Sequence, residues 1–189
     1  MSQQKLLIKV VGELQRLQIP YMLTGSFVSS LQGEPRSTHD IDFVVSMQKP
    51  QASALADAFQ MPEYYLDKQS ALEAVDHQIM FGLIELESGD KVDFWILTND
   101  EFDQSRFQRR RTENLYGQSV HVSAPEDTIL MKLKWAVMSG GSERQFGDCL
   151  RIYEVLHGTL DEGYLQAWSI KLGVAELLQR LKNEAINPI

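Results

Sequence analysis

The sequence contains a single cysteine, Cys149, among 189 residues. One thiol cannot form a disulfide within the chain, so the cysteine content does not indicate an oxidising compartment. The chain also lacks an apolar run long enough to cross a bilayer, and its first residues lack the apolar block followed by small residues that marks a signal peptide. We therefore expect a cytoplasmic protein that does not associate with membranes.

Positive charge is scarce in this chain. Its 18 Lys and Arg residues are outnumbered by 26 Asp and Glu, which gives a formal net charge of -8. Proteins that hold DNA by general electrostatic attraction cluster Lys and Arg against the phosphates, so we expect no general DNA binding. Arginines gather only at residues 106–111. That cluster is either a solvated helix end or a local attraction for an acidic acceptor such as an RNA end.

The hydrophobic pattern divides the chain into two parts that differ in predicted secondary structure. Up to about residue 123, β-prone runs alternate with amphipathic helical segments, and "QIMFGLIELE" and "KVDFWIL" are separated by "SGD" as in a β-hairpin. From Ala124 onward the pattern is helical throughout, beginning with a proline at a helix start. We predict a mixed domain over residues 1–123 and a helical segment over 124–189 that packs on it.

Two aspartates, Asp40 and Asp42, open the apolar run "DIDFVVS". Alternate residues of a strand point to the same face, so both carboxylates are expected to meet the same space. A hard divalent cation such as Mg²⁺ is held by one or two carboxylates together with substrate phosphates, and it would remove the repulsion between them. Short acidic motifs are also common at caps, turns and exposed polar positions, so the pair alone does not decide between these interpretations.

Gly25 and Ser26 lie at the junction between the β-prone run "YMLTG" and a short helical segment. Free backbone N–H groups and the positive end of a helix dipole favour a phosphate at such a junction, and a glycine permits a ligand to approach closely. Ser26 fits phosphate contact and plain helix capping equally well.

Asp93 is the one charged residue in the otherwise apolar run "VDFWIL". An unpaired carboxylate in such a strand is costly, so a cation or a charged partner is expected beside it. The partner would be a metal ion, Lys91 or an arginine.

Taken in order, these features resemble the nucleotidyltransferase superfamily that includes polymerase beta and the minimal nucleotidyltransferases. The stretch "GSFVSSLQGEPRSTHDIDFVV" is similar to uncharacterised bacterial nucleotidyltransferases and to the abortive-infection type of toxin–antitoxin proteins. The segments "APEDTILMKLKWA" and "RQFGDCLRIY" look like the helical tail of that group. The resemblance covers most of residues 20–156.

The resemblance implies an α+β fold with a small mixed β-sheet flanked by helices and an all-helical C-terminal tail. It implies that Gly25 and Ser26 contact the triphosphate of an NTP, and that Arg36 and Lys132 help to bind the nucleotide. Arg36 could equally balance the aspartates, and Lys132 could be an ordinary lysine at a helix edge. The catalytic and metal-binding residues would be Asp40, Asp42 and Asp93, which would hold two Mg²⁺ ions, with Mn²⁺ as an alternative.

The expected function is transfer of a nucleoside monophosphate from an NTP to a hydroxyl of an acceptor, with release of pyrophosphate. The acceptor stays open between a protein side chain, a tRNA end and a small molecule, because the walls of a pocket set that choice. The alternative is a non-catalytic or weakly catalytic partner-binding protein of a toxin–antitoxin pair on the same scaffold. A metal-dependent phosphohydrolase is a third interpretation, since paired carboxylates and two metals also serve that reaction.

Overall fold

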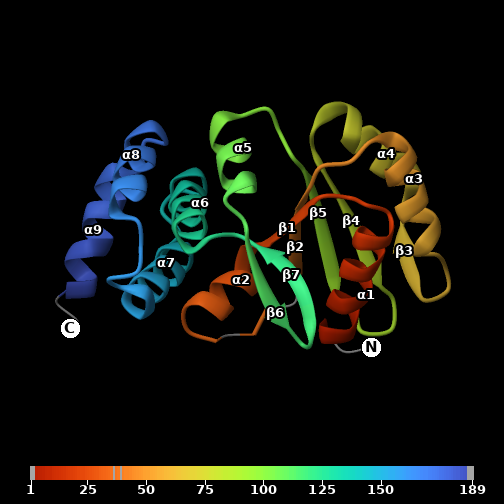
Figure 1. Ribbon diagram of the computed structural model, residues 1–189, viewed down its shortest axis with the longest axis horizontal. Helices are drawn as coiled ribbons and strands as arrows, with labels where there is room; N and C mark the ends of the chain where they lie inside the picture. Colours follow the sequence, from red (N-terminus) through yellow and green to blue (C-terminus); the bar gives the residue numbers. More distant parts are fainter. Residues whose placement is uncertain (1–2, 36, 39, 187–189) are drawn as a thin grey trace. The chain divides into compact units, whose positions relative to one another are not determined.

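The computed structural model describes residues 3–35, 37–38 and 40–186 (Figure 1). The chain forms two compact units. The first comprises Met1–Phe27 and Thr38–Ser123, and the second comprises Val28–Ser37 and Ala124–Ile189. Residues 28–37 thus group with the later helices. The division into a nucleotidyltransferase-like domain over 1–123 and a helical segment over 124–189 stays a prediction.

The first unit contains both helices and strands along its whole length, and two pairs of strands follow each other directly. Its helices and strands are α1 (Gln3–Arg16), β1 (Tyr21–Thr24), the start of α2 (Gly25–Gln32), β2 (Asp40–Val45), α3 (Lys49–Ala58), β3 (Tyr64–Leu66), α4 (Lys68–His77), β4 (Met80–Glu85), β5 (Lys91–Ile96), α5 (Glu101–Gln108), β6 (Arg111–Leu115) and β7 (Gln118–Val122).

The strands form one mixed sheet in the order β3-β4-β5-β2-β1-β7-β6. β2 runs parallel to β5 and antiparallel to β1, while β1 runs parallel to β7. β4 and β5 are antiparallel neighbours, so the predicted hairpin is confirmed. The α+β fold with a mixed sheet flanked by helices is also confirmed.

One face of the sheet carries the apolar core of the first unit. Ile41 and Phe43 of β2 are fully buried on this face. The Phe94 ring stacks between those of Phe43 and Phe81, with ring centroids 5.9 Å and 5.0 Å apart. Helix α1 packs on the same face, where the Gln15 side chain donates a hydrogen bond to the Tyr21 hydroxyl. Burial of these aromatic rings fixes the sheet register, because a slip of one residue would turn every side chain to the other face.

The opposite face is covered at one end. Met22 of β1 and Val44 of β2 form a buried cluster there with Phe107 of α5. Helix α5 begins after Asp100, whose carboxylate accepts hydrogen bonds from the backbone N–H groups of Phe102 and Asp103. The rest of this face carries the aspartates that the sequence singles out.

The second unit is built from helices. They are α6 (Pro125–Met138), α7 (Glu143–Leu156), α8 (Glu162–Lys171) and α9 (Ala175–Ile186), together with the end of α2. α6 packs on α7 and α8, and α9 packs on α7 and α8. Buried acidic residues at the start of α6 have partners: the Asp161 N–H donates to Glu126, and the Tyr164 hydroxyl donates to Asp127.

Two local contacts determine where helices begin and how they pack. Helix α4 begins after its N-cap Asp67, whose carboxylate accepts a hydrogen bond from the Ser70 N–H. Gly33 follows α2 without a left-handed backbone. Its role is close packing on α7, since an added Cβ would lie 3.0 Å from the Ile152 backbone nitrogen.

Among the residues that the structure describes, no helix has the length and the apolar character that a membrane span requires.

Candidate active site

The open face of the sheet presents side chains in rows across neighbouring strands, because residues in register share a face. One row runs from β4 to β1 and is called here the carboxylate row; it consists of Gly82, Asp93, Asp42 and Thr24. Asp42 and Asp93 are direct register partners on the parallel strands β2 and β5. Asp40 lies two residues before Asp42 on the same face, and it is opposite Lys91. The structure thus brings two of the predicted aspartates side by side and places the third next to them.

Gly25 packs directly against Asp42. Its φ of +70° lies in the left-handed region, which glycine adopts at little cost. A Cβ added at this position would lie 2.6 Å from the Asp42 Cγ and 2.9 Å from its Cβ. From the sequence, we expect Gly25 to permit the close approach of a ligand. The structure shows a nearer reason for the glycine, which is room for the Asp42 carboxylate at the start of α2.

Asp93 has an unusual electrostatic environment for an aspartate. Burial raises the pKa of its carboxyl above the ordinary value, the negative charge of Asp40 raises it further, and Lys91 opposes both effects. Within the described part of the chain, no ion pair links Asp93 to Lys91 or to an arginine. Of the predicted basic partners, Lys91 acts on Asp93 only through its charge, which lowers the pKa of Asp93 without an ion pair. Negative charge accumulates on this face, and a cation would relieve it.

The donor set suits a hard divalent cation, since aspartate oxygens are the ligands that Mg²⁺ prefers. Gly25 leaves room for the Asp42 carboxylate. Burial and the negative charge of Asp40 both raise the pKa of Asp93, and a positive charge beside these carboxylates would offset the repulsion between them. Across residues 3–35, 37–38 and 40–186, no three His, Cys, Asp or Glu side chains form a group that could hold a metal ion by themselves. The fit of this face to a cation therefore rests on the chemistry of its aspartates.

Two of the predicted nucleotide contacts need separate comment. Arg36 lies outside the described residues, as does the neighbouring His39. Ser26 is half-buried in the first turn of α2, directly after Gly25. The structure thus places Gly25 and Ser26 at the predicted junction of a strand and a helix.

Lys132 occupies a different environment from the one expected of a lysine at a helix edge. Its side chain is buried on α6, and its Nζ donates hydrogen bonds to the Asp148 Oδ2 at 2.7 Å and to the Gln145 Oε1 at 3.0 Å. Asp148 thus pairs with a lysine of the neighbouring helix, although Arg144 stands four residues before it on α7. The role of Lys132 in nucleotide binding stays a prediction.

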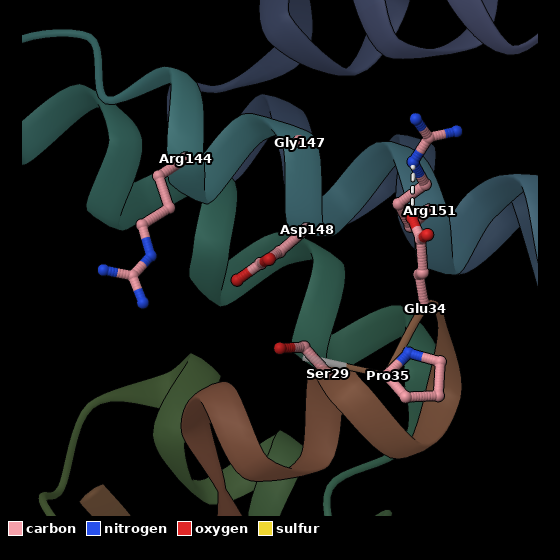
Figure 2. Close-up of a pocket in the computed structure, with 7 residues that line it drawn as sticks. All are labelled: Ser29, Glu34, Pro35, Arg144, Gly147, Asp148 and Arg151. Atoms are coloured by element: carbon pink, nitrogen blue, oxygen red, sulfur yellow. Dashed lines mark ion pairs between the residues drawn. The ribbon is translucent and has the colours of Figure 1, made fainter. Parts of the chain in front are cut away.

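A cavity of about 270 Å³ lies beside this ion pair in the second unit (Figure 2). Its lining residues are Ser29, Glu34, Pro35, Arg144, Gly147, Asp148 and Arg151. Arg151 is held by Glu34 across the cavity at 3.2 Å and by Glu154 of its own helix at 2.8 Å. Polar and charged groups of both signs therefore line this cavity.

Comparison with solved structures identifies the fold, whereas no family model and no curated protein matches the sequence. The antibiotic-resistance factor ANT(2'')-Ia is similar over 94% of this chain and 97% of its own, with a TM-score of 0.62 and 14% identity. An antigenic nucleotidyltransferase-like protein from Paracoccidioides brasiliensis is similar over 95% of this chain and 92% of its own, with a TM-score of 0.56 and 19% identity. The lincosamide antibiotic adenylyltransferase LnuA, solved with lincomycin bound, is similar over 80% of this chain and 96% of its own, with a TM-score of 0.53 and 16% identity.

The chain has the nucleotidyltransferase fold. The superfamily resemblance of the stretch from Gly25 to Val45 is confirmed at the level of the fold. ANT(2'')-Ia is also known in complex with adenylyl-2''-tobramycin, in a structure similar to this one with a TM-score of 0.50 and 14% identity. At identities this low, the similarity to these structures shows the fold alone.

Sequence reasoning missed Gly82, which completes the carboxylate row opposite Asp93. The available signal was a lone glycine inside the strand run "QIMFGLIELE". A glycine within a strand often marks the place where a ligand or another backbone approaches closely.

Proposed function

We propose that this chain is a metal-dependent nucleotidyltransferase that moves a nucleoside monophosphate from an NTP to a hydroxyl group of an acceptor and releases pyrophosphate. The single observation that carries the proposal is the register pairing of Asp42 with Asp93, with Gly25 packed against Asp42 at the start of α2. That arrangement sets two carboxylates beside a helix N-terminus, where a phosphate is favoured. The nucleotidyltransferase fold supports the same reaction class.

Each of the predicted residues has a role in this reaction. Asp40, Asp42 and Asp93 would hold Mg²⁺, which Mn²⁺ could replace. The ion would supply positive charge that neutralises the phosphates and the developing negative charge. Gly25 and Ser26 would contact the triphosphate through the first turn of α2. Arg36 and Lys132 are proposed as further nucleotide contacts on the basis of the sequence resemblance.

The transfer is a displacement at the α-phosphorus. The acceptor oxygen forms a bond to this phosphorus, and the bond from the phosphorus to the oxygen that bridges to the β-phosphate breaks. Pyrophosphate leaves with the electron pair of that bond. The proton of the acceptor hydroxyl passes to the Asp93 carboxylate and from there to water. The chain's own contribution is therefore positioning, charge neutralisation and one proton transfer.

The acceptor is a hydroxyl-bearing molecule. Among the similar structures, ANT(2'')-Ia was solved with adenylyl-2''-tobramycin and LnuA with lincomycin, so small hydroxylated molecules are bound on this fold. A protein side chain and a tRNA end are the other acceptor classes to be tested. In the toxin–antitoxin alternative, the same scaffold would act by binding a protein partner.

Incubation with each α-labelled NTP, Mg²⁺ or Mn²⁺ and cell extract tests the proposal. We expect label transfer to an acceptor, and at least about a 100-fold loss in Asp42→Asn, because removal of one electrostatic contact at a reacting phosphate has effects of that order. Asp76→Asn is the matched control, since Asp76 pairs with Lys49 away from the carboxylate row. Equal activity of wild type and Asp42→Asn contradicts the proposal, and capture of the same protein partner by both favours the binding alternative. Release of phosphate in place of pyrophosphate indicates a phosphohydrolase.

A further inference from the structure

We infer that the acceptor of this chain is a hydroxyl compound with a flat apolar ring, and that the ring binds over Gly82 beside Asp93. The site is called here the Gly82 trough and is formed by Met80, Gly82, Ile84 and Trp95. The inference rests on the proposed function for the reaction itself, while the binding of the ring depends only on the shape and chemistry of the sheet.

Gly82 leaves a gap in the open face. It is the register partner of Asp93, and both residues belong to the carboxylate row. A Cβ added at Gly82 would contact only the Asp93 Oδ1 at 3.7 Å and the Val92 carbonyl oxygen at 4.0 Å. These are ordinary contact distances, so neither sterics nor a left-handed backbone demands glycine at this position. The glycine instead leaves free space directly next to the carboxylate that accepts the proton.

The walls of the trough are apolar. Met80 and Trp95 are register partners on one side of Gly82, and they are 40% and 37% exposed. Val44 of β2 is the register partner of Trp95, and it is buried against Phe107 of α5. Met80 and Trp95 themselves are not covered by α5 and stay accessible. Ile84 is half-buried on the other side of Gly82. A tryptophan face beside a methionine is suited to stacking with a ring.

The spacing along β5 matches a ring that carries a hydroxyl. Trp95 lies two residues beyond Asp93 on the same face, which corresponds to about 6.6 Å along the strand. An aromatic bicycle is about as long as this, so its hydroxyl can reach Asp93 while its far ring covers Trp95. An acceptor without a ring could reach the carboxylate but would leave the apolar side chains of the walls exposed to water.

The walls of the Gly82 trough do not select a polycationic acceptor. The aspartates of this face would attract its amines to the carboxylates, whereas the side chains of Met80, Ile84 and Trp95 carry no charge and offer an amine no partner. Lys91 lies opposite Ile84 at the edge of the trough and is exposed. A cationic sugar is therefore held away from the walls, and the Gly82 trough itself favours a neutral ring compound.

Fluorine NMR of the chain labelled with 5-fluorotryptophan tests the inference without nucleotide or metal. The chain contains three tryptophans, Trp95, Trp135 and Trp168, and Trp95→Phe assigns the first of them. With 2-naphthol as the probe, we expect a saturable shift of the Trp95 signal and none at the other two. Glycerol, which has hydroxyls and no ring, and tobramycin, which is cationic, should leave Trp95 unchanged.

Gly82→Val fills the trough with a residue that suits a strand. It should weaken 2-naphthol binding at least about tenfold, the scale on which a few methyl groups act in an apolar pocket. The matched control is Ile79→Ala, which also removes an exposed apolar side chain. Ile79 directly precedes Met80, so its side chain is expected to point to the other face of the sheet, and the variant should bind like wild type. The inference is wrong if 2-naphthol does not shift the Trp95 signal, or if Gly82→Val binds 2-naphthol as tightly as wild type. It is also wrong if tobramycin or glycerol shifts the signal as much as 2-naphthol does. A Trp95 shift that depends on the concentration of the chain would show that a second copy of the chain, and no ring compound, covers the site.

The two proposals fail separately. If the chain binds 2-naphthol at Trp95 but transfers no nucleotide, the proposed function is wrong and the Gly82 trough stands as a ring-binding site. If nucleotide is transferred and the Gly82 trough binds no ring compound, the inference about the acceptor is wrong.

Discussion

Gly25 and Asp42 share space that only a glycine leaves open. The backbone of Gly25 is left-handed, with φ of +70°, and a Cβ on it would overlap the side chain of Asp42. The first residue of α2 and the second aspartate of β2 are therefore fitted to each other before any ligand is considered. Any change at Gly25 acts on the carboxylate as well as on the backbone.

Gly25→Ala should abolish nucleotide transfer and destabilise the chain. The left-handed backbone costs an alanine about 1–2 kcal/mol, and the overlap with Asp42 adds about 1–3 kcal/mol. The free energy of unfolding from urea titration and the transfer assay measure the two effects. Gly89→Ala is the matched control, because Gly89 has a φ of +76° and nothing lies within 4 Å of an added Cβ. Equal losses in the two variants would show that Asp42 does not depend on Gly25.

Lys132→Met should lower the free energy of unfolding by about 3–5 kcal/mol, because it leaves the Asp148 carboxylate buried without its cation. The side chains of this ion pair are 6% and 12% exposed. Asp148→Asn should be destabilising as well, and the double variant should lose less than the sum of the two. Additive losses would contradict a direct interaction.

The same two variants test whether Lys132 binds nucleotide. Asp148→Asn breaks the ion pair and keeps the lysine, whereas Lys132→Met removes the positive charge. If Lys132 contacts a phosphate, the dissociation constant of an NTP measured by calorimetry should rise in Lys132→Met and not in Asp148→Asn. Equal changes in both variants would make the lysine a structural residue.

His121 should titrate below the ordinary histidine pKa of about 6.5. Burial lowers the pKa of its imidazole, and the positive charge of Arg110 lowers it further. The unfolded chain therefore binds the proton more tightly than the folded one, so this histidine makes the fold less stable as the pH falls from the unfolded pKa toward the folded one. Proton NMR of the imidazole should show the lowered midpoint, and Arg110→Gln should raise it. A midpoint at or above about 6.5 in the wild type would contradict this environment.

Much of the fold follows from local patterns in the sequence. The apolar spacing of residues 3–18 predicts α1, whose buried residues are Leu6, Leu7, Val10, Val11 and Leu14. The alternation in "DIDFVVS" correctly predicts that Ile41 and Phe43 enter the core while the aspartates share the other face. The hairpin of β4 and β5 follows from two β-prone runs separated by a turn. These predictions succeed because each depends on periodicity within one short segment.

The features that the sequence did not reveal are of two kinds. β3 has three residues and β6 consists of largely exposed polar residues, so neither has the apolar alternation that marks a strand. The parallel pairing of β2 with β5 joins segments about fifty residues apart, and nothing local specifies it. The Lys132–Asp148 pair depends likewise on how α6 and α7 pack, so the spacing of residues within either helix does not predict it.

Asp40, Asp42 and Asp93 are proposed to hold divalent cations together with a nucleotide at the start of α2. The decisive experiment is to grow crystals of the chain with Mn²⁺ and a non-hydrolysable NTP and to locate manganese by its anomalous scattering. We expect manganese peaks within about 2.0–2.6 Å of oxygens from these three carboxylates, with the phosphates beside Gly25 and Ser26. Manganese and phosphates bound elsewhere, or an Asp93 carboxylate turned away from the ions, would show that this site is wrong.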